Sequence, residues 1–184
     1  MVEKTTLASV LSKRASGRNA AGKKREKLRE QLWPGSGADL WSRKLEKGFT
    51  TIPRLLPLVM HLIKGLAKKG NPSLAYLELW ARAFDEHIIT IIDEEAPAYA
   101  CGYTGTRAVR TWREHIFALR DLGFIKVAAQ GNREIAHILL LNPVLVCNNL
   151  HQKKKTSEEW WNAFVHRANE IGAQIGPQTS SADE

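Results

Sequence analysis

Two threonines and three arginines lie within eight residues of a segment that has helical periodicity. These side chains are Thr106, Arg107, Arg110, Thr111 and Arg113. At about 100° per residue they lie opposite an apolar stripe, which is formed by Val109, Trp112, Ile116 and Leu119. Arginine binds guanine through two hydrogen bonds, and a recognition helix presents its N-terminal residues to the bases of the major groove. The pattern predicts that Arg107 and Arg110 contact base edges and that the other three side chains are shared between bases and phosphates.

The same helix face has a simpler interpretation. Arg110 and Glu114 are four residues apart, so they can form an ion pair on a solvated surface that binds no ligand. In the DNA-binding interpretation, Glu114 accepts a hydrogen bond from cytosine or holds an arginine in place. Thr104, in the tight turn before the helix, is a further candidate for DNA contact.

Two more polar segments are candidate DNA contacts. One is a predicted hairpin, whose candidate residues are Lys126, Gln130, Asn132 and Arg133. They are placed to reach a flanking minor groove or its phosphates, although a polar hairpin tip is equally common without a ligand. The other is the N-terminal arm, with Lys23, Lys24 and Arg25. An arm that follows a neighbouring groove raises affinity and steepens its dependence on salt.

The distribution of charge favours a polyanionic partner. The formal net charge is +8, and residues 1–30 hold nine Lys and Arg against three Asp and Glu. Residues 31–150 are closer to balance, with 14 cations and 11 anions, and residues 151–184 have four and five. Cations near phosphates release condensed counterions, so a basic arm fits double-stranded DNA as a partner. A tail that only improves solubility is the alternative.

Break signals and composition predict the domain organisation. We expect a basic, largely flexible arm at residues 1–36, closed by Trp33-Pro34-Gly35-Ser36-Gly37, and a folded domain at residues 37–150. A C-terminal helix at residues 151–175 and a disordered tail at residues 176–184 should follow. Inside the arm, residues 24–32 are good helix formers with little apolar surface.

Periodicity and capping signals predict the elements of the domain. Helices are expected at 53–68, 72–86, 96–101, 106–122 and 144–150, and strands at 88–92, 124–127 and 135–141. The second of these helices should bury the face that carries Leu74, Leu77, Trp80, Ala81 and Phe84. Between the last two strands, residues 130–133 should form the tip of a hairpin. The order of these elements predicts a winged helix-turn-helix, mainly α with a small β-hairpin wing (α+β) and extra helices on both sides.

A resemblance supports this expectation. Residues 98–109 (AYACGYTGTRAV) and 118–125 (ALRDLGFI) resemble the winged-helix DNA-binding domains of bacterial regulators. The span 48–149 is similar to winged-helix proteins of plasmids and other mobile elements. The resemblance implies sequence-specific binding of duplex DNA in plasmid replication initiation or copy control, or in transcriptional regulation of plasmid or mobile-element genes. The sequence departs from simple winged helices at residues 72–86, where those proteins have a shorter connection.

The C-terminal helix carries an aromatic stripe that one winged helix does not need. Its members are Trp160, Trp161 and Phe164. Packed core is the simplest interpretation, and the alternatives are the seam of a homodimer or the contact surface of a protein-interaction module. Binding of RNA or single-stranded DNA is less favoured, because aromatic residues are not interleaved with the cations.

Enzyme activity, cofactors and small-molecule substrates are not expected. The six histidines lack metal-ligand spacing, and the chain has neither a phosphate-binding glycine loop nor a nucleophile elbow. The acidic residues at 93–95, with Asp85 and Glu86 upstream, are better explained as first-turn acids of a helix than as a magnesium site. Cys101 and Cys147 are expected to be small core residues. Without an apolar leader or a membrane-length segment, a cytoplasmic protein is expected.

Overall fold

The computed structural model describes residues 20–176, and the contacts of the chain divide it into two compact units, residues 1–48 and 49–184. In the first unit, residues 20–32 are helical and a short 3₁₀ helix, η1, spans Ser36–Asp39. Within residues 20–48, the described part of this unit, the large apolar side chains are exposed: Leu28, Leu32, Trp33, Leu40, Trp41 and Leu45. The second unit begins at Phe49, twelve residues after the predicted boundary, because residues 37–48 contribute no buried side chain.

The second unit begins with two helices, α2 (Leu56–Leu66) and α3 (Ser73–Arg82). The predicted start of α2 was three residues early, because the amide of Leu56 bonds to the carbonyl of Pro53 in a turn and Pro57 takes the first-turn position. The hydroxyl of Ser73 donates to the carbonyl of Met60 at 2.7 Å, which joins the start of α3 to α2.

The predicted buried face of α3 was wrong in part. The residues that α3 buries are Ser73, Ala75, Tyr76, Leu79 and Trp80. The helix ends at Arg82, where Ala83 turns to an extended conformation, so Phe84 lies beyond it and is 80% exposed. Tyr76 instead packs edge-on against Trp80 and Phe124, and these aromatic contacts decide which face of α3 is buried.

Three antiparallel strands form a small sheet in the order β1-β3-β2, with bounds β1 (Ile88–Thr90), β2 (Ile125–Gln130) and β3 (Arg133–Leu140). Ile138 in the central strand lies opposite Ile89 on one side and Val127 on the other. The predicted hairpin tip is confirmed, because Gln130 pairs with Arg133 around a two-residue turn. Gly131 in that turn has a φ of 58°, a conformation that glycine adopts without strain.

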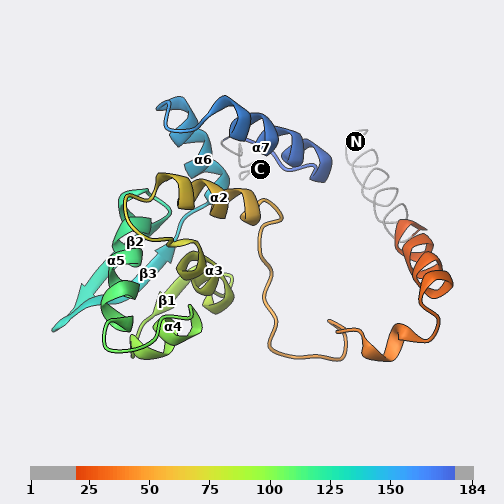
Figure 1. Cartoon of the computed structure of the whole chain (residues 1–184), viewed down its shortest axis with the longest axis horizontal. Coiled ribbons are helices and arrows are strands. Elements are labelled where there is room, and N and C mark those ends of the chain that lie inside the picture. The colour runs from red at the N-terminus through yellow and green to blue at the C-terminus, as the bar shows by residue number, and fades with distance from the viewer. Residues whose placement is uncertain (1–19, 177–184) are drawn as a thin grey trace, which may run out of the picture. The chain divides into compact units, whose positions relative to one another are not determined.

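Between β1 and β2 lie the helices α4 (Glu95–Ala100) and α5 (Ala108–Asp121), as the sequence predicted to within two residues (Figure 1). Asp93 begins α4, since its carboxylate accepts hydrogen bonds from the amides of Glu95 and Ala96. Two glycines with positive φ, Gly102 and Gly105, form the turn from α4 to α5. Helix α3 packs against both α4 and α5.

Two further helices complete the unit, α6 (Pro143–Gln152) and α7 (Glu158–Ile171). Asn142 and Ser157 cap these helices, because their side chains accept hydrogen bonds from amides of the first turns. Both helices pack against α2. The chain is thus an α+β protein with a small antiparallel sheet, and none of the helices in residues 20–176 has the length and apolar character needed to cross a bilayer.

Candidate nucleic-acid interface

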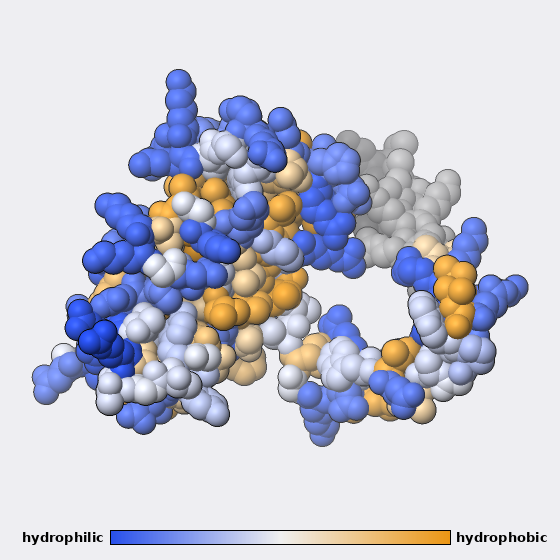
Figure 2. Space-filling model, viewed as in Figure 1, coloured by the Kyte–Doolittle hydropathy of each residue, from blue (hydrophilic) through white to orange (hydrophobic). Residues whose placement is uncertain are grey.

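Helix α5 has one buried face and one charged face. Trp112, Ile116 and Leu119 are fully buried and attach the helix to the core. Arg110 and Arg113 are exposed on the opposite side. Figure 2 shows hydrophilic residues gathered on the side of the compact unit where Figure 1 places α5 and the hairpin. The core therefore fixes α5 in a position where its first two turns present arginine side chains outward.

The structure places the predicted residues of this segment on one continuous stretch. Thr104 and Thr106 are exposed in the turn before α5, and Arg107 is exposed at its N-cap position. Thr111 is only half-buried rather than fully outward, so its hydroxyl is less available than those of the two preceding threonines. Together they surround the N-terminus of α5, where free backbone amides and the helix dipole favour an anion.

Carboxylates hold two of the three arginines. Arg110 Nε donates to Glu114 Oε1 at 3.0 Å, and the two side chains are 78% and 57% exposed. Arg113 Nε donates to Glu94 Oε2 at 2.6 Å, where Glu94 is only 17% exposed. Arg107 forms no ion pair with any residue in the described range 20–176. Arg107 is thus the most available cation of this helix, and Arg113 is the most constrained.

A buried histidine joins the turn to α5. The hydroxyl of Tyr103 is hydrogen-bonded to His115 Nδ1 at 2.6 Å, and the two rings meet edge-on. Burial lowers the pKa of His115, an effect that the neighbouring Glu114 partly opposes, and burial raises the pKa of Tyr103 to about 12. Both groups are therefore neutral near pH 7, and His115 is only 8% exposed.

The hairpin residues form a hydrogen-bonded cluster of their own. Arg133 Nη1 donates to the carbonyl of Ile91 at 2.9 Å, which attaches the hairpin tip to the segment after β1. Gln130 Oε1 accepts hydrogen bonds from Arg133 and from His137 Nε2. The other ring nitrogen of His137 accepts from the hydroxyl of Thr90 at 3.2 Å. Gln130 and Arg133 are consequently engaged within the sheet.

The remaining predicted DNA contacts are exposed residues. Lys126 and Asn132 are exposed on β2 and at the hairpin tip, and no ion pair among residues 20–176 involves Lys126. Lys23, Lys24 and Arg25 are exposed on the helix at residues 20–32, which belongs to the first unit rather than to the one that contains α5. The α5 segment and the hairpin are thus the predicted sites within one compact unit.

Sequence reasoning missed three residues that hold the site together. The sequence pattern predicts Glu94 as a first-turn acid, but its carboxylate binds Arg113 on α5, 19 residues away. The pattern predicts no contact for Tyr103 or Gly70, yet both lie against His115. Tyr103 is 12 residues and Gly70 is 45 residues from His115, so no pattern of neighbouring residues contains either contact.

The acidic residues near α4 have structural partners. Asp93 caps α4 and Glu94 binds Arg113, which accounts for two acids of the segment 93–95. Within residues 20–176, no three His, Cys, Asp or Glu side chains are grouped so that they could share a metal ion.

Comparison with known proteins adds no further constraint. No protein-family model matches the chain, and no curated protein or solved structure matches it.

Proposed function

We propose that the chain is a winged helix-turn-helix protein that binds duplex DNA sequence-specifically through α5. The observation that carries this proposal is the combination, on one helix, of a fully buried aromatic and aliphatic face with exposed arginines in the first two turns. A helix of this kind fits the major groove with its N-terminal residues at the base edges.

The arrangement of the neighbouring elements supports the proposal. The order β1, α4, α5, β2 and β3, with β1 paired to β3, is the order expected for a winged helix. In such a domain α4 crosses the DNA backbone, α5 enters the groove and the β2–β3 hairpin is the wing. Arg107 and Arg110 are then the base contacts, and Lys126 and Asn132 of the wing contact the flanking phosphates.

The cellular role is proposed from the resemblance of residues 98–109 and 118–125. Plasmid replication initiation or copy control is the role we favour, and transcriptional regulation of plasmid or mobile-element genes is the alternative. Footprinting on the resident plasmid distinguishes them, because an initiator binds repeated sites at an origin whereas a regulator binds at promoters.

A protein-interaction module is the alternative of another class, with α7 as its contact surface. Trp160 and Phe164 are buried inside the chain, so α7 offers a partner little of its aromatic stripe. The same burial weighs against a dimer built on those two side chains. The dependence of binding affinity on salt concentration distinguishes the two classes, because phosphate contacts weaken steeply as salt rises and apolar contacts do not.

Substitution of the arginines tests the proposal. We expect Arg107→Ala and Arg110→Ala each to lower affinity for the preferred duplex by about tenfold at about 150 mM salt, since a base contact contributes about 1–3 kcal/mol. Arg120→Ala is the matched control, because Arg120 lies in the last turn of the same helix and pairs with Asp121. Undiminished duplex binding by a folded Arg107→Ala/Arg110→Ala protein would refute the assignment of α5.

A further inference from the structure

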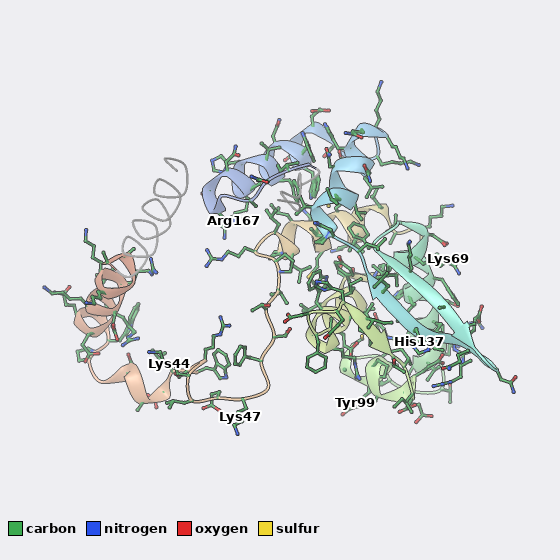
Figure 3. The ribbon with its side chains drawn as sticks, turned by 180° about the vertical axis from the view of Figure 1, so that it is seen from behind. Lys44, Lys47, Lys69, Tyr99, His137 and Arg167 are labelled. Atoms are coloured by element: carbon green, nitrogen blue, oxygen red, sulfur yellow. The ribbon has the colours of Figure 1, made fainter. Side chains whose placement is uncertain are left out.

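The loop between α2 and α3 places two lysines beside α5. Lys68 and Lys69 are exposed, and neither takes part in an ion pair among residues 20–176. Figure 3 shows Lys69 on the side of the compact unit that also carries the hairpin residue His137. The sequence pattern did not single out these lysines, because they lie about 40 residues before the helix that they flank.

Close packing of Gly70 fixes this loop against α5. A Cβ at Gly70 would lie 3.3 Å from Cδ2 and Cε1 of His115 and closer still to Nε2, so only glycine lets the backbone approach the ring this far. Gly70 also has a φ of 66°, which side chains of L-residues rarely adopt. Because Tyr103 binds the opposite edge of the same imidazole, one ring joins the loop, the turn and α5.

The position of His115 sets where the lysines lie along α5. His115 is five residues after Arg110, which is about 7.5 Å along a helix axis. The loop that contacts His115 therefore lies little more than one helical turn beyond Arg110, beside the first turns of α5 that the proposed function places in the groove. Arg110 and Arg113 are each held by a carboxylate, whereas the loop supplies two cations without such partners.

We propose that Lys68 and Lys69 form a phosphate-binding clamp of the DNA site, held at a fixed distance from α5 by the contact of Gly70 with His115. This inference rests on the proposed function. The lysines contact the sugar-phosphate backbone beside the groove, so they contribute affinity without reading sequence. The loop that leads into the extra helix α3, at which the chain departs from simpler winged helices, thereby gains a role in DNA binding.

The test compares the salt dependence of duplex binding in three proteins: the full chain, Lys68→Ala/Lys69→Ala, and Lys153→Ala/Lys154→Ala. The control pair removes the same charge from the exposed linker between α6 and α7. Loss of two phosphate contacts should make the slope of log affinity against log salt shallower by about 1.8. Between about 50 and 200 mM salt, the affinity of the lysine variant should then fall about twelvefold less than that of the full chain.

The ratio of affinities for preferred and unrelated duplexes should be unchanged in the lysine variant. A slope equal to that of the full chain, or an equal decrease in the control variant, would overturn the clamp while leaving α5 as the recognition helix. A lower ratio would also overturn it, because the lysines would then read sequence. Full-length protein that binds no duplex at all would overturn the proposed function and the clamp together.

Discussion

Glu94 and Arg113 connect the start of α4 to the second turn of α5. Glu94 Oε2 accepts a hydrogen bond from Arg113 Nε at 2.6 Å. The side chain of Glu94 is 17% exposed and that of Arg113 is 48% exposed. The bond lies apart from the Tyr103–His115 contact, which joins the turn to the same helix. Two separate polar contacts therefore hold α5: one joins it to the start of α4, and the other joins it to the turn. The first of them occupies Arg113, which the charge pattern alone assigned to DNA.

We expect this ion pair to stabilise the fold measurably. Glu94→Ala should lower the free energy of unfolding by about 1 kcal/mol, with a coupling energy to Arg113→Ala of about 0.5–1 kcal/mol in a double-mutant cycle, since the pair is partly exposed. Urea denaturation of the two single variants and the double variant measures this coupling. Strictly additive effects of the two substitutions would mean that the pair contributes nothing to stability.

Local signals were sufficient to predict α5 and the hairpin. The apolar stripe through Trp112, Ile116 and Leu119 is buried as its spacing predicts, and Gly123 follows the helix with a φ of 85°. At the hairpin, Gly131 marks the turn, and the apolar run at residues 135–141 predicts the position of β3. These features depend on residues fewer than ten positions apart, which is the range that periodicity and turn chemistry describe.

Contacts between distant segments were not predictable in the same way. Helix α3 buries Tyr76 because Phe124 lies against it, and no local pattern contains both residues. Gly70 meets His115 across 45 positions, so the proximity of Lys69 to α5 follows only from the packed fold. The sequence therefore predicts the centre of the candidate site, α5, and its Arg110–Glu114 ion pair, but not the flanking loop or the Glu94–Arg113 ion pair.

The two neighbouring tryptophans of α7 should differ in their contribution to stability. Trp160 is 7% exposed and its indole N–H donates to the carbonyl of Leu58 at 3.0 Å. Trp160→Phe removes this bond and part of the buried ring, so the free energy of unfolding should fall by about 1–3 kcal/mol. Trp161 is half-buried and stacks on His151 with centroids 4.0 Å apart, a contact that phenylalanine can keep. Trp161→Phe should thus cost less than about 1 kcal/mol, and chemical denaturation that ranks the two variants in the opposite order would contradict this assignment.

Stability should decrease in mild acid because of His115. Burial lowers the pKa of this imidazole in the folded chain, so above about pH 6.5 both folded and unfolded forms are neutral and the full stability is present. As the pH falls below that value, the unfolded chain takes up a proton that the folded chain does not, and the free energy of unfolding declines until the folded pKa is passed. His115→Gln keeps a group that can form a hydrogen bond with Tyr103, and it should show a smaller decline between pH 7.5 and pH 5.5 in urea titrations. His166→Gln, on the exposed face of α7, is the control and should retain the full decline.

Removal of residues 1–48 should lower the affinity for DNA without preventing the second unit from folding. Every buried core residue in the described part of the chain lies between Leu55 and Ala168, so the fragment 49–184 should unfold cooperatively with a free energy within about 0.5 kcal/mol of the full chain. Its affinity for duplex DNA should nevertheless fall, with a shallower salt slope, because residues 1–30 carry nine of the 27 Lys and Arg. Calorimetry and fluorescence titration at several salt concentrations measure the two effects on the same samples.

A fragment that fails to fold would show that the second unit depends on residues before Phe49, whereas an unchanged salt slope in a folded fragment would show that the basic arm does not contact phosphate.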